Sequence, residues 1–191
     1  MRNVDWDAVQ ENDGTFDNPV PGGYVAKICR VEDVEDKEYL LIEWDFSEGA
    51  FKGFNEDTFS RAGFWPTRLF RSYKPKALGF FKAFKTALEE SNPGYHFRED
   101  ELNALVGKRF GVVLAEEEYI KSNGARATRL YVAQTRSLRA IKEGDYTVPD
   151  KKLLPSDQRD THRATDPVTV SATGFDEGGF AEVEDDGELP F

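Results

Sequence analysis

Alternation between apolar and polar residues predicts strands in the first third of the chain. Residues 24–31 (YVAKICRV) and 39–46 (YLLIEWDF) repeat with a period of two, as in a strand with one face on a core. In the second stretch the core face is expected to hold Leu40, Ile42, Trp44 and Phe46. Residues 54–61 (FNEDTFSR) predict a third, weaker strand.

The periodicity then changes to that of a helix. After a loop over residues 62–74, Pro75 suits a first helical turn, and SNPG at 91–94 suits a helix stop. Between them, apolar residues recur at spacings of four, three and four, which predicts one buried stripe: Ala77, Phe81, Phe84 and Leu88. Phe80, next to this stripe, is also expected in the core, and residues 98–107 predict a short second helix.

Two more strands are predicted in the following part of the chain. Residues 108–120 (KRFGVVLAEEEYI) and 127–141 (ATRLYVAQTRSLRAI) flank a turn that contains Asn-Gly, a dipeptide favoured in hairpins. The resulting order, β-β-β-α-β-β, is that of the OB-fold, a five-stranded Greek-key barrel that commonly binds oligonucleotides. The predicted fold class is therefore mainly β with one or two helices. An SH3-like barrel or another α+β sheet is the alternative.

Composition divides the chain into three segments. Residues 1–22 are polar and turn-rich and are interpreted as an N-terminal arm. Residues 23–148 contain the periodic elements and form the predicted nucleic-acid-binding domain. Residues 149–191 are rich in Asp, Thr, Pro and Gly with little apolar material to bury, which predicts a disordered acidic tail.

Charge is distributed in blocks along the chain. The 191 residues carry a formal net charge of −11. Residues 1–51 and residues 143–191 each hold four basic and thirteen acidic residues, whereas residues 52–142 hold seventeen basic and ten acidic ones. This basic middle between acidic ends favours a polyanionic partner for the central domain.

Several classes of protein are disfavoured by what the sequence lacks. Cys29 is the only cysteine, which excludes an intrachain disulfide and fits a reducing compartment. The acidic start of the chain has no apolar run of the signal-peptide kind, and no segment approaches the run of about eighteen apolar residues that spans a membrane. We therefore expect a soluble cytoplasmic protein with no membrane partner.

Candidate chemistry is concentrated in residues 59–88. This window holds seven Lys or Arg residues, eight aromatic residues and no acid. Cations that neutralise phosphates, interleaved with rings that stack on unpaired bases, are what single-stranded nucleic acid requires. The candidate binding residues of the window are Arg61, Phe64, Trp65, Arg68, Phe70, Arg71, Tyr73, Lys74 and Lys76. The alternative for the aromatic residues of the loop is a hydrophobic lid that folds back onto the core.

A second group of candidates surrounds the predicted hairpin between the last two strands. In an OB-fold this hairpin borders the ligand groove, as does the connection between the first two strands. The candidates here are Tyr119, Lys121, Arg126, Arg129 and Tyr131. The connection between the first two strands, EDVEDKE, is acidic and therefore disfavours a phosphate contact.

The signals for an enzyme are weak. The chain has two histidines, no H-x-x-x-H pair and no phosphate-binding G-x-x-x-x-G-K-[ST] motif. Glu35 and Lys37 have the Glu-x-Lys spacing of some metal-dependent nucleases, but short matches arise often in so charged a chain. We expect a protein that is not an enzyme and needs no cofactor or metal, with a nuclease as the remote alternative.

Extended runs of the sequence resemble a known family. The runs EGAFKGF, GFWPTRLFRSYKPKALGFFKAFKTALEESNPGY, LVGKRFGVVLAEEEYI and TRLYVAQTRS are similar to small proteins from phage replication modules of Gram-positive hosts, and the similarity covers about residues 20–150. That family is regarded as single-stranded DNA-binding proteins with an OB-fold. The resemblance implies single-stranded DNA binding in replication, recombination or repair, within the cytoplasm of a bacterial host. It implies no oligomeric state.

The end of the chain resembles a second feature. Bacterial and several phage single-stranded DNA-binding proteins end in an acidic segment closed by Pro-Phe or Phe, which docks on replication and repair proteins. The residues that match this pattern are Asp185, Asp186, Glu188, Leu189, Pro190 and Phe191. A protein-binding replication adaptor with a β-barrel is the alternative function, because aromatic residues and Arg also form protein-binding hot spots.

Overall fold

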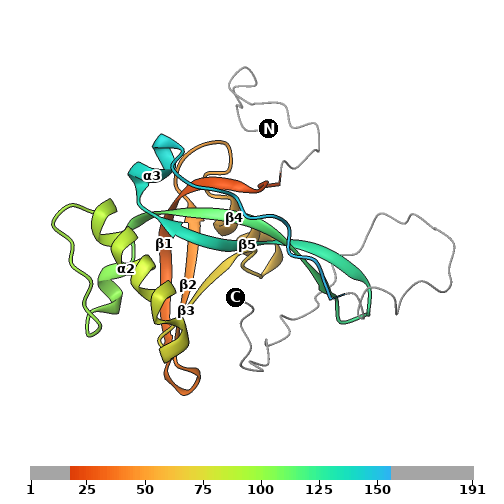
Figure 1. Ribbon diagram of the computed structural model, residues 1–191, viewed down its shortest axis with the longest axis horizontal. Coiled ribbons are helices and arrows are strands. Elements are labelled where there is room, and N and C mark those ends of the chain that lie inside the picture. The colour runs from red at the N-terminus through yellow and green to blue at the C-terminus, as the bar shows by residue number, and fades with distance from the viewer. Residues whose placement is uncertain (1–17, 156–191) are drawn as a thin grey trace, which may run out of the picture.

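Five antiparallel strands form one sheet in the computed structural model, which describes residues 18–155 (Figure 1). The spatial order of the strands is β3-β2-β1-β4-β5. Their bounds are Gly22–Val34 for β1, Tyr39–Phe46 for β2, Arg68–Ser72 for β3, Arg109–Ile120 for β4 and Arg126–Arg136 for β5. The edge strands β3 and β5 lie close to each other, so the sheet curls toward a barrel. The fold is mainly β and OB-like, as the order of elements predicted.

The helices are short and lie outside the sheet. The α-helices are α1 (Phe54–Ala62), α2 (Leu78–Ser91) and α3 (Leu138–Glu143), and the 3₁₀ turns are η2 (Glu35–Lys37), η3 (Pro75–Ala77) and η4 (Leu102–Leu105). The helix α2, between β3 and β4, packs against both of these strands. In the part of the chain that the structure describes, no helix is both long and apolar enough to cross a bilayer.

A bulge lets β1 serve both halves of the sheet. Residues 22–27 pair with β4, and residues 26–34 pair with β2. The register with β2 shifts between Ile28 and Arg30, so Cys29 is the extra residue of the bulge. A bulged strand bends and twists more strongly, which allows one strand to turn the corner of a small barrel.

The core lies between the curled sheet and α2. The four residues predicted on the core face of β2 are all buried: Leu40, Ile42, Trp44 and Phe46. Phe84 and Leu88 of α2 are fully buried, and the Phe84 ring contacts that of Phe110 in β4 edge-on, with ring centroids 5.4 Å apart. The helix stripe is thus confirmed at its centre, but the prediction for Phe80 is wrong because its side chain is 57% exposed.

The predicted third strand, residues 54–61, is a helix instead. Its first backbone N–H groups are satisfied by a buried carboxylate of β2, because the N–H groups of Asn55 and Glu56 donate to Asp45 at 2.9 and 3.4 Å. Asn55 also donates through its side chain to the Trp44 carbonyl, at 2.8 Å. A helix can begin where such acceptors replace the missing intrahelical ones. The helix ends at Gly63, which adopts the left-handed conformation.

The third strand lies in the segment that we predicted to be a loop. Residues 68–72 pair with β2 from Glu43↔Arg68 to Tyr39↔Ser72. Farther along the chain, the predicted last strand is too long, because β5 ends at Arg136 and α3 follows. Ser137 begins that helix by accepting the Ala140 N–H on its hydroxyl oxygen at 3.3 Å, which is a typical N-cap.

Candidate nucleic-acid interface

The outer face of β3 presents an aromatic residue to solvent. Along β3, Leu69 and Arg71 point inward, whereas Arg68, Phe70 and Ser72 point outward. Phe70 is 51% exposed and lies opposite Leu41 of β2. Its ring meets that of Tyr39 edge-on, with centroids 5.5 Å apart and planes at 79°. The two rings form an exposed apolar step of the kind on which an unpaired base stacks.

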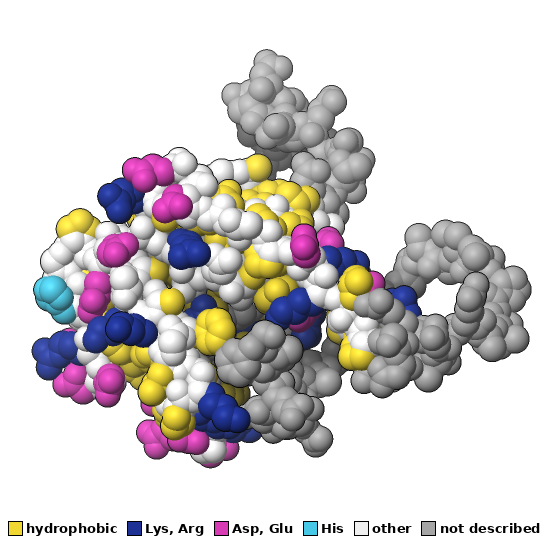
Figure 2. All heavy atoms as spheres, viewed as in Figure 1, with side chains coloured by type: hydrophobic (Ala, Val, Ile, Leu, Met, Phe, Trp, Pro, Cys, Tyr) yellow, Lys and Arg dark blue, Asp and Glu magenta, His cyan; other side chains and the backbone are white. Residues whose placement is uncertain are grey.

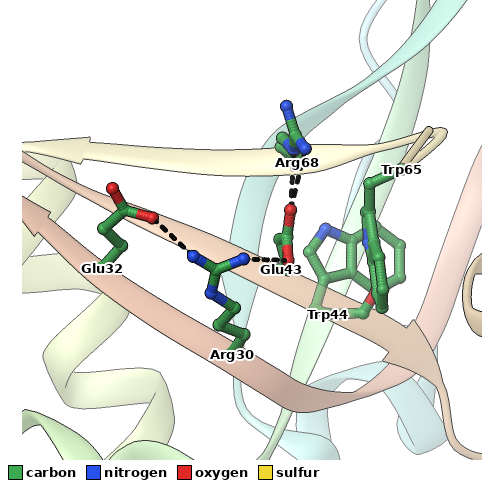
Figure 3. A network of polar contacts seen from close by, with 6 residues as sticks. All are labelled: Arg30, Glu32, Glu43, Trp44, Trp65 and Arg68. Atoms are coloured by element: carbon green, nitrogen blue, oxygen red, sulfur yellow. Dashed lines mark hydrogen bonds and ion pairs between the residues drawn. The ribbon is translucent and has the colours of Figure 1, made fainter. Parts of the chain in front are cut away.

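A cluster of guanidinium groups lies next to this step on the same face (Figure 3). Arg68 donates through Nε to Glu43 Oε1 at 3.0 Å, and its Nη2 lies 2.8 Å from the same oxygen. Arg30 of β1 approaches the other oxygen of Glu43 at 3.9 Å and contacts Glu32 at 2.9 Å. The buried carboxylate of Glu43 therefore holds two arginines from neighbouring strands. Arg30, whose side chain is 65% exposed, presents its charge to solvent.

Trp65 does not belong to this surface. It is only 5% exposed, and its indole Nε1 donates to the Trp44 carbonyl at 2.9 Å (Figure 3). The prediction that Trp65 stacks on bases is therefore wrong. Trp65 instead folds back onto the core, which is the alternative of a hydrophobic lid. A buried indole needs a hydrogen-bond acceptor, and the open β2 carbonyl beside α1 provides one.

Arg71 is also removed from the candidate contacts. It is 8% exposed, and its guanidinium lies over the Phe84 ring, 5.9 Å from the centroid. Nη1 donates to the Phe70 carbonyl at 2.9 Å. Burial lowers the pKa of Arg71 to about 10, so the side chain keeps its charge at neutral pH. It acts inside the fold, at the contact of β3 with α2, and not as a phosphate ligand.

The remaining candidates of residues 59–88 are scattered. Phe64 (41% exposed), Arg61 and Lys76 lie on the surface, and Lys74 is half-buried. The hydroxyl of Tyr73 donates to Asp33 at 3.0 Å. The window lacks acids in the sequence, but the fold brings acids from β1 and β2 to it. The net positive charge around this window in the folded chain is therefore smaller than the count over residues 59–88 suggests.

The β4–β5 arm, residues 115–131, carries the hairpin candidates. It projects beyond the point at which β1 stops pairing with β4 (Figure 1). Tyr119, Arg129 and Tyr131 share one face of the arm, because Arg129 pairs with Glu117 and Tyr131 with Ala115. Arg129 lies over the Tyr119 ring at 5.0 Å and contacts Glu117 at 2.8 Å. Near the tip, Lys121 and Arg126 are exposed.

Acidic side chains gather at the end of the molecule that holds the β1–β2 hairpin. Figure 2 shows them at the bottom of the view with basic side chains beside them, whereas basic, acidic and hydrophobic side chains lie together along the arm. Glu35 and Lys37 lie in that hairpin, in the exposed turn η2. A shallow depression beside it is lined by residues 102–104 and by five acidic residues: Asp33, Glu35, Glu99, Asp100 and Glu101. This end of the molecule repels phosphates.

Metal-ligating side chains are not gathered anywhere in residues 18–155. This part of the chain contains no group of three or more His, Cys, Asp or Glu side chains placed to hold a metal ion. The candidates for partner docking, Asp185, Asp186, Glu188, Leu189, Pro190 and Phe191, lie outside the described residues, as do most of the N-terminal arm and the tail.

Sequence reasoning missed Arg30 and Tyr39 of this surface. It also missed Lys152, whose ammonium lies 4.3 Å from the centre of the Tyr131 ring in the arm. Tyr39 has the same strand parity as Leu41 and Glu43, so it could have been placed on the outer face of β2. Arg30 required the bulge at Cys29, which the sequence pattern does not reveal. Lys152 lies in a segment that was assigned to the tail.

Comparison with known proteins adds no identification. A scan against protein-family models finds no match, and a search of curated proteins finds no significant relative.

Proposed function

We propose that the protein binds single-stranded DNA with little sequence preference and serves replication, recombination or repair. The observation that carries the proposal is the exposed Phe70–Tyr39 step beside the arginines held by Glu43, on the outer face of an OB-like sheet. A ring step next to cations matches the alternation of bases and phosphates along an unpaired strand.

The two parts of the surface are suited to different parts of the ligand. Phe70 leaves about half of its surface open to a base. In the arm, by contrast, a cation already lies over each tyrosine ring: Arg129 over Tyr119 and Lys152 over Tyr131. We infer that bases stack on the β3–β2 face and that the arm contacts phosphates.

Binding to poly-dT at two salt concentrations, with a duplex of equal length as control, tests this function. For single strands, log K falls by about 0.7 per neutralised phosphate for each tenfold rise in salt. Five phosphate contacts then predict a loss of about a hundredfold between 50 and 200 mM salt. Equal affinity for the duplex, or no binding to poly-dT, contradicts the proposal.

The tail is proposed to recruit other proteins of the same system. Its residues 184–191, EDDGELPF, combine acids with the apolar run Leu-Pro-Phe. Replacing Phe191 by Ala should abolish capture of a replication or repair protein from the host lysate while poly-dT affinity stays unchanged. If Phe191→Ala retains every partner of the parent chain, the tail does not work through this residue.

The adaptor remains a second candidate because of one observation. Phe59, 46% exposed, packs on the buried Trp65 with ring centroids 5.6 Å apart, and Phe64, next to Trp65 in the chain, is 41% exposed. Exposed aromatic residues of this kind serve as anchors in protein interfaces. Salt-insensitive capture of a protein that Phe59→Ala abolishes, together with no affinity for poly-dT, would favour the adaptor.

A further inference from the structure

The segment that follows α3 is fastened along the sheet. We call residues 145–154 the strap. Figure 1 shows it running from α3 beside β4 and β5 toward the end of the arm. The Tyr146 ring packs on Gly23 of β1 so closely that a Cβ atom at Gly23 would lie 2.4 Å from Tyr146 Cζ. Farther on, the side-chain amide of Gln134 donates to the Thr147 carbonyl at 3.2 Å.

Near its end the strap pairs with β4 through a single β-bridge. The N–H of Lys152 donates to the Glu116 carbonyl, and the N–H of Glu118 donates to the Lys152 carbonyl, both at 2.9 Å. The pairing is parallel and centred on Glu117. It occupies the β4 edge beyond Leu114, where β1 no longer pairs. The strap therefore satisfies backbone groups that the arm would otherwise leave open.

Strand alternation sends the two lysines of the strap to opposite faces of the arm. Lys151 donates to the Thr128 hydroxyl at 2.8 Å and lies 3.8 Å from Glu118. Lys152 turns to the other face, where its ammonium lies 4.3 Å from the centre of the Tyr131 ring. Lys151 thus fastens the strap, and Lys152 joins the face that carries Arg129.

We propose that Lys152 is a phosphate-binding residue and that the strap is a third strand of the DNA-binding arm. This proposal rests on the proposed function. The backbone of Lys152 is fixed by two hydrogen bonds and its ammonium by the ring of Tyr131, so little conformational freedom is left to lose on binding. Arg129 over Tyr119 repeats the same arrangement on the same face. Two cations are thereby held at fixed places along one face of the arm.

Three variants of the full-length chain test the role of Lys152. Lys152→Gln removes the charge, Lys152→Arg keeps it, and Lys142→Gln makes the same change of net charge on α3. Lys142 is exposed, with Glu48 4.0 Å away, and lies outside the proposed surface. Each variant is titrated with poly-dT between 50 and 300 mM salt, and its thermal unfolding is measured in parallel.

The expected result is specific to one variant. Loss of one phosphate contact lowers the magnitude of the salt slope by about 0.7, which weakens binding about fivefold at 0.1 M salt. Lys152→Gln should show this loss, whereas Lys152→Arg and Lys142→Gln should match the parent chain. A parental slope for Lys152→Gln, or an equal loss for Lys142→Gln, overturns the proposal. Failure of the parent chain itself to bind poly-dT refutes the proposed function, and this proposal with it.

Discussion

The exposed ring of Phe70 gives the most direct test of the interface. Replacing Phe70 by Ala removes the surface on which a base would stack, at a cost of about 1–3 kcal/mol in binding free energy. That range corresponds to a rise of about 5- to 150-fold in Kd. The fold should tolerate the change. The side chain is 51% exposed, so about 1 kcal/mol of burial is lost, plus about 1 kcal/mol for the edge contact with Tyr39.

The control for Phe70→Ala is the same substitution at Phe80. Phe80 is 57% exposed and lies in α2, outside the proposed surface, so Phe80→Ala removes a similar exposed ring. Both variants are titrated with poly-dT at several salt concentrations and unfolded in urea. Because stacking carries no net charge, Phe70→Ala should weaken binding by a similar factor at every salt concentration and leave the salt slope unchanged.

Trp65→Ala should have the opposite effect to Phe70→Ala, because it should lower stability without removing a contact to DNA. Its indole is buried and donates to the Trp44 carbonyl, so truncation should cost about 3–5 kcal/mol of folding free energy, with any loss of binding tracking the unfolded fraction. If Phe70→Ala binds like the parent chain, or if Phe80→Ala is weakened equally, the stacking step is not on the β3–β2 face. A Trp65→Ala chain with parental stability and weak binding would likewise refute the placement of these residues.

Three further predictions concern charge and reactivity. Glu43→Gln should release Arg68 and Arg30 from their shared carboxylate. The salt slope for poly-dT should then become steeper, and the folding stability should fall by about 2 kcal/mol. An unchanged salt slope would mean that neither arginine reaches a phosphate. Burial, followed by the effect of Glu56, raises the pKa of Cys29 to about 12. The thiol of the native protein should therefore be alkylated at pH 8 about a thousandfold more slowly than that of the protein unfolded in urea. Equal alkylation rates would refute the protection of Cys29 by the fold. Deleting residues 176–191, which hold seven acids and no base, should raise DNA affinity at low salt, and unchanged affinity would exclude competition by the tail.

Periodicity predicted the elements whose two faces differ clearly. The four core residues of β2 and the centre of the α2 stripe follow from spacing alone, because a core selects apolar residues at fixed intervals. In β3 the same rule fails. Arg71 points inward and Phe70 outward, so at these two positions the apolar and charged residues are exchanged relative to an ordinary half-buried strand. The exchange is possible because the Arg71 guanidinium rests on Phe84 and its Nη1 finds the Phe70 carbonyl.

Local sequence also misled where the partner of a segment lies far along the chain. Residues 54–61 were predicted to form a weak strand, but Asp45, some ten residues earlier, accepts the N–H groups that begin the helix. Gly53 before the segment and Gly63 after it are the local signals of helix ends that could have corrected the prediction.

The same long-range effect changes how charge must be counted. The absence of acids from residues 59–88 favoured this window as the binding site, yet Glu43 lies against Arg68 and Asp33 against Tyr73 in the folded chain. Conversely, the arm has acids in its sequence, and one of them, Glu118, serves to fasten the strap through Lys151. A phosphate-binding surface is therefore defined by which cations the fold leaves facing solvent. For the proposed DNA-binding surface, these cations include Arg129 of the arm and Lys152 of the strap, which lie outside the window that the sequence singled out.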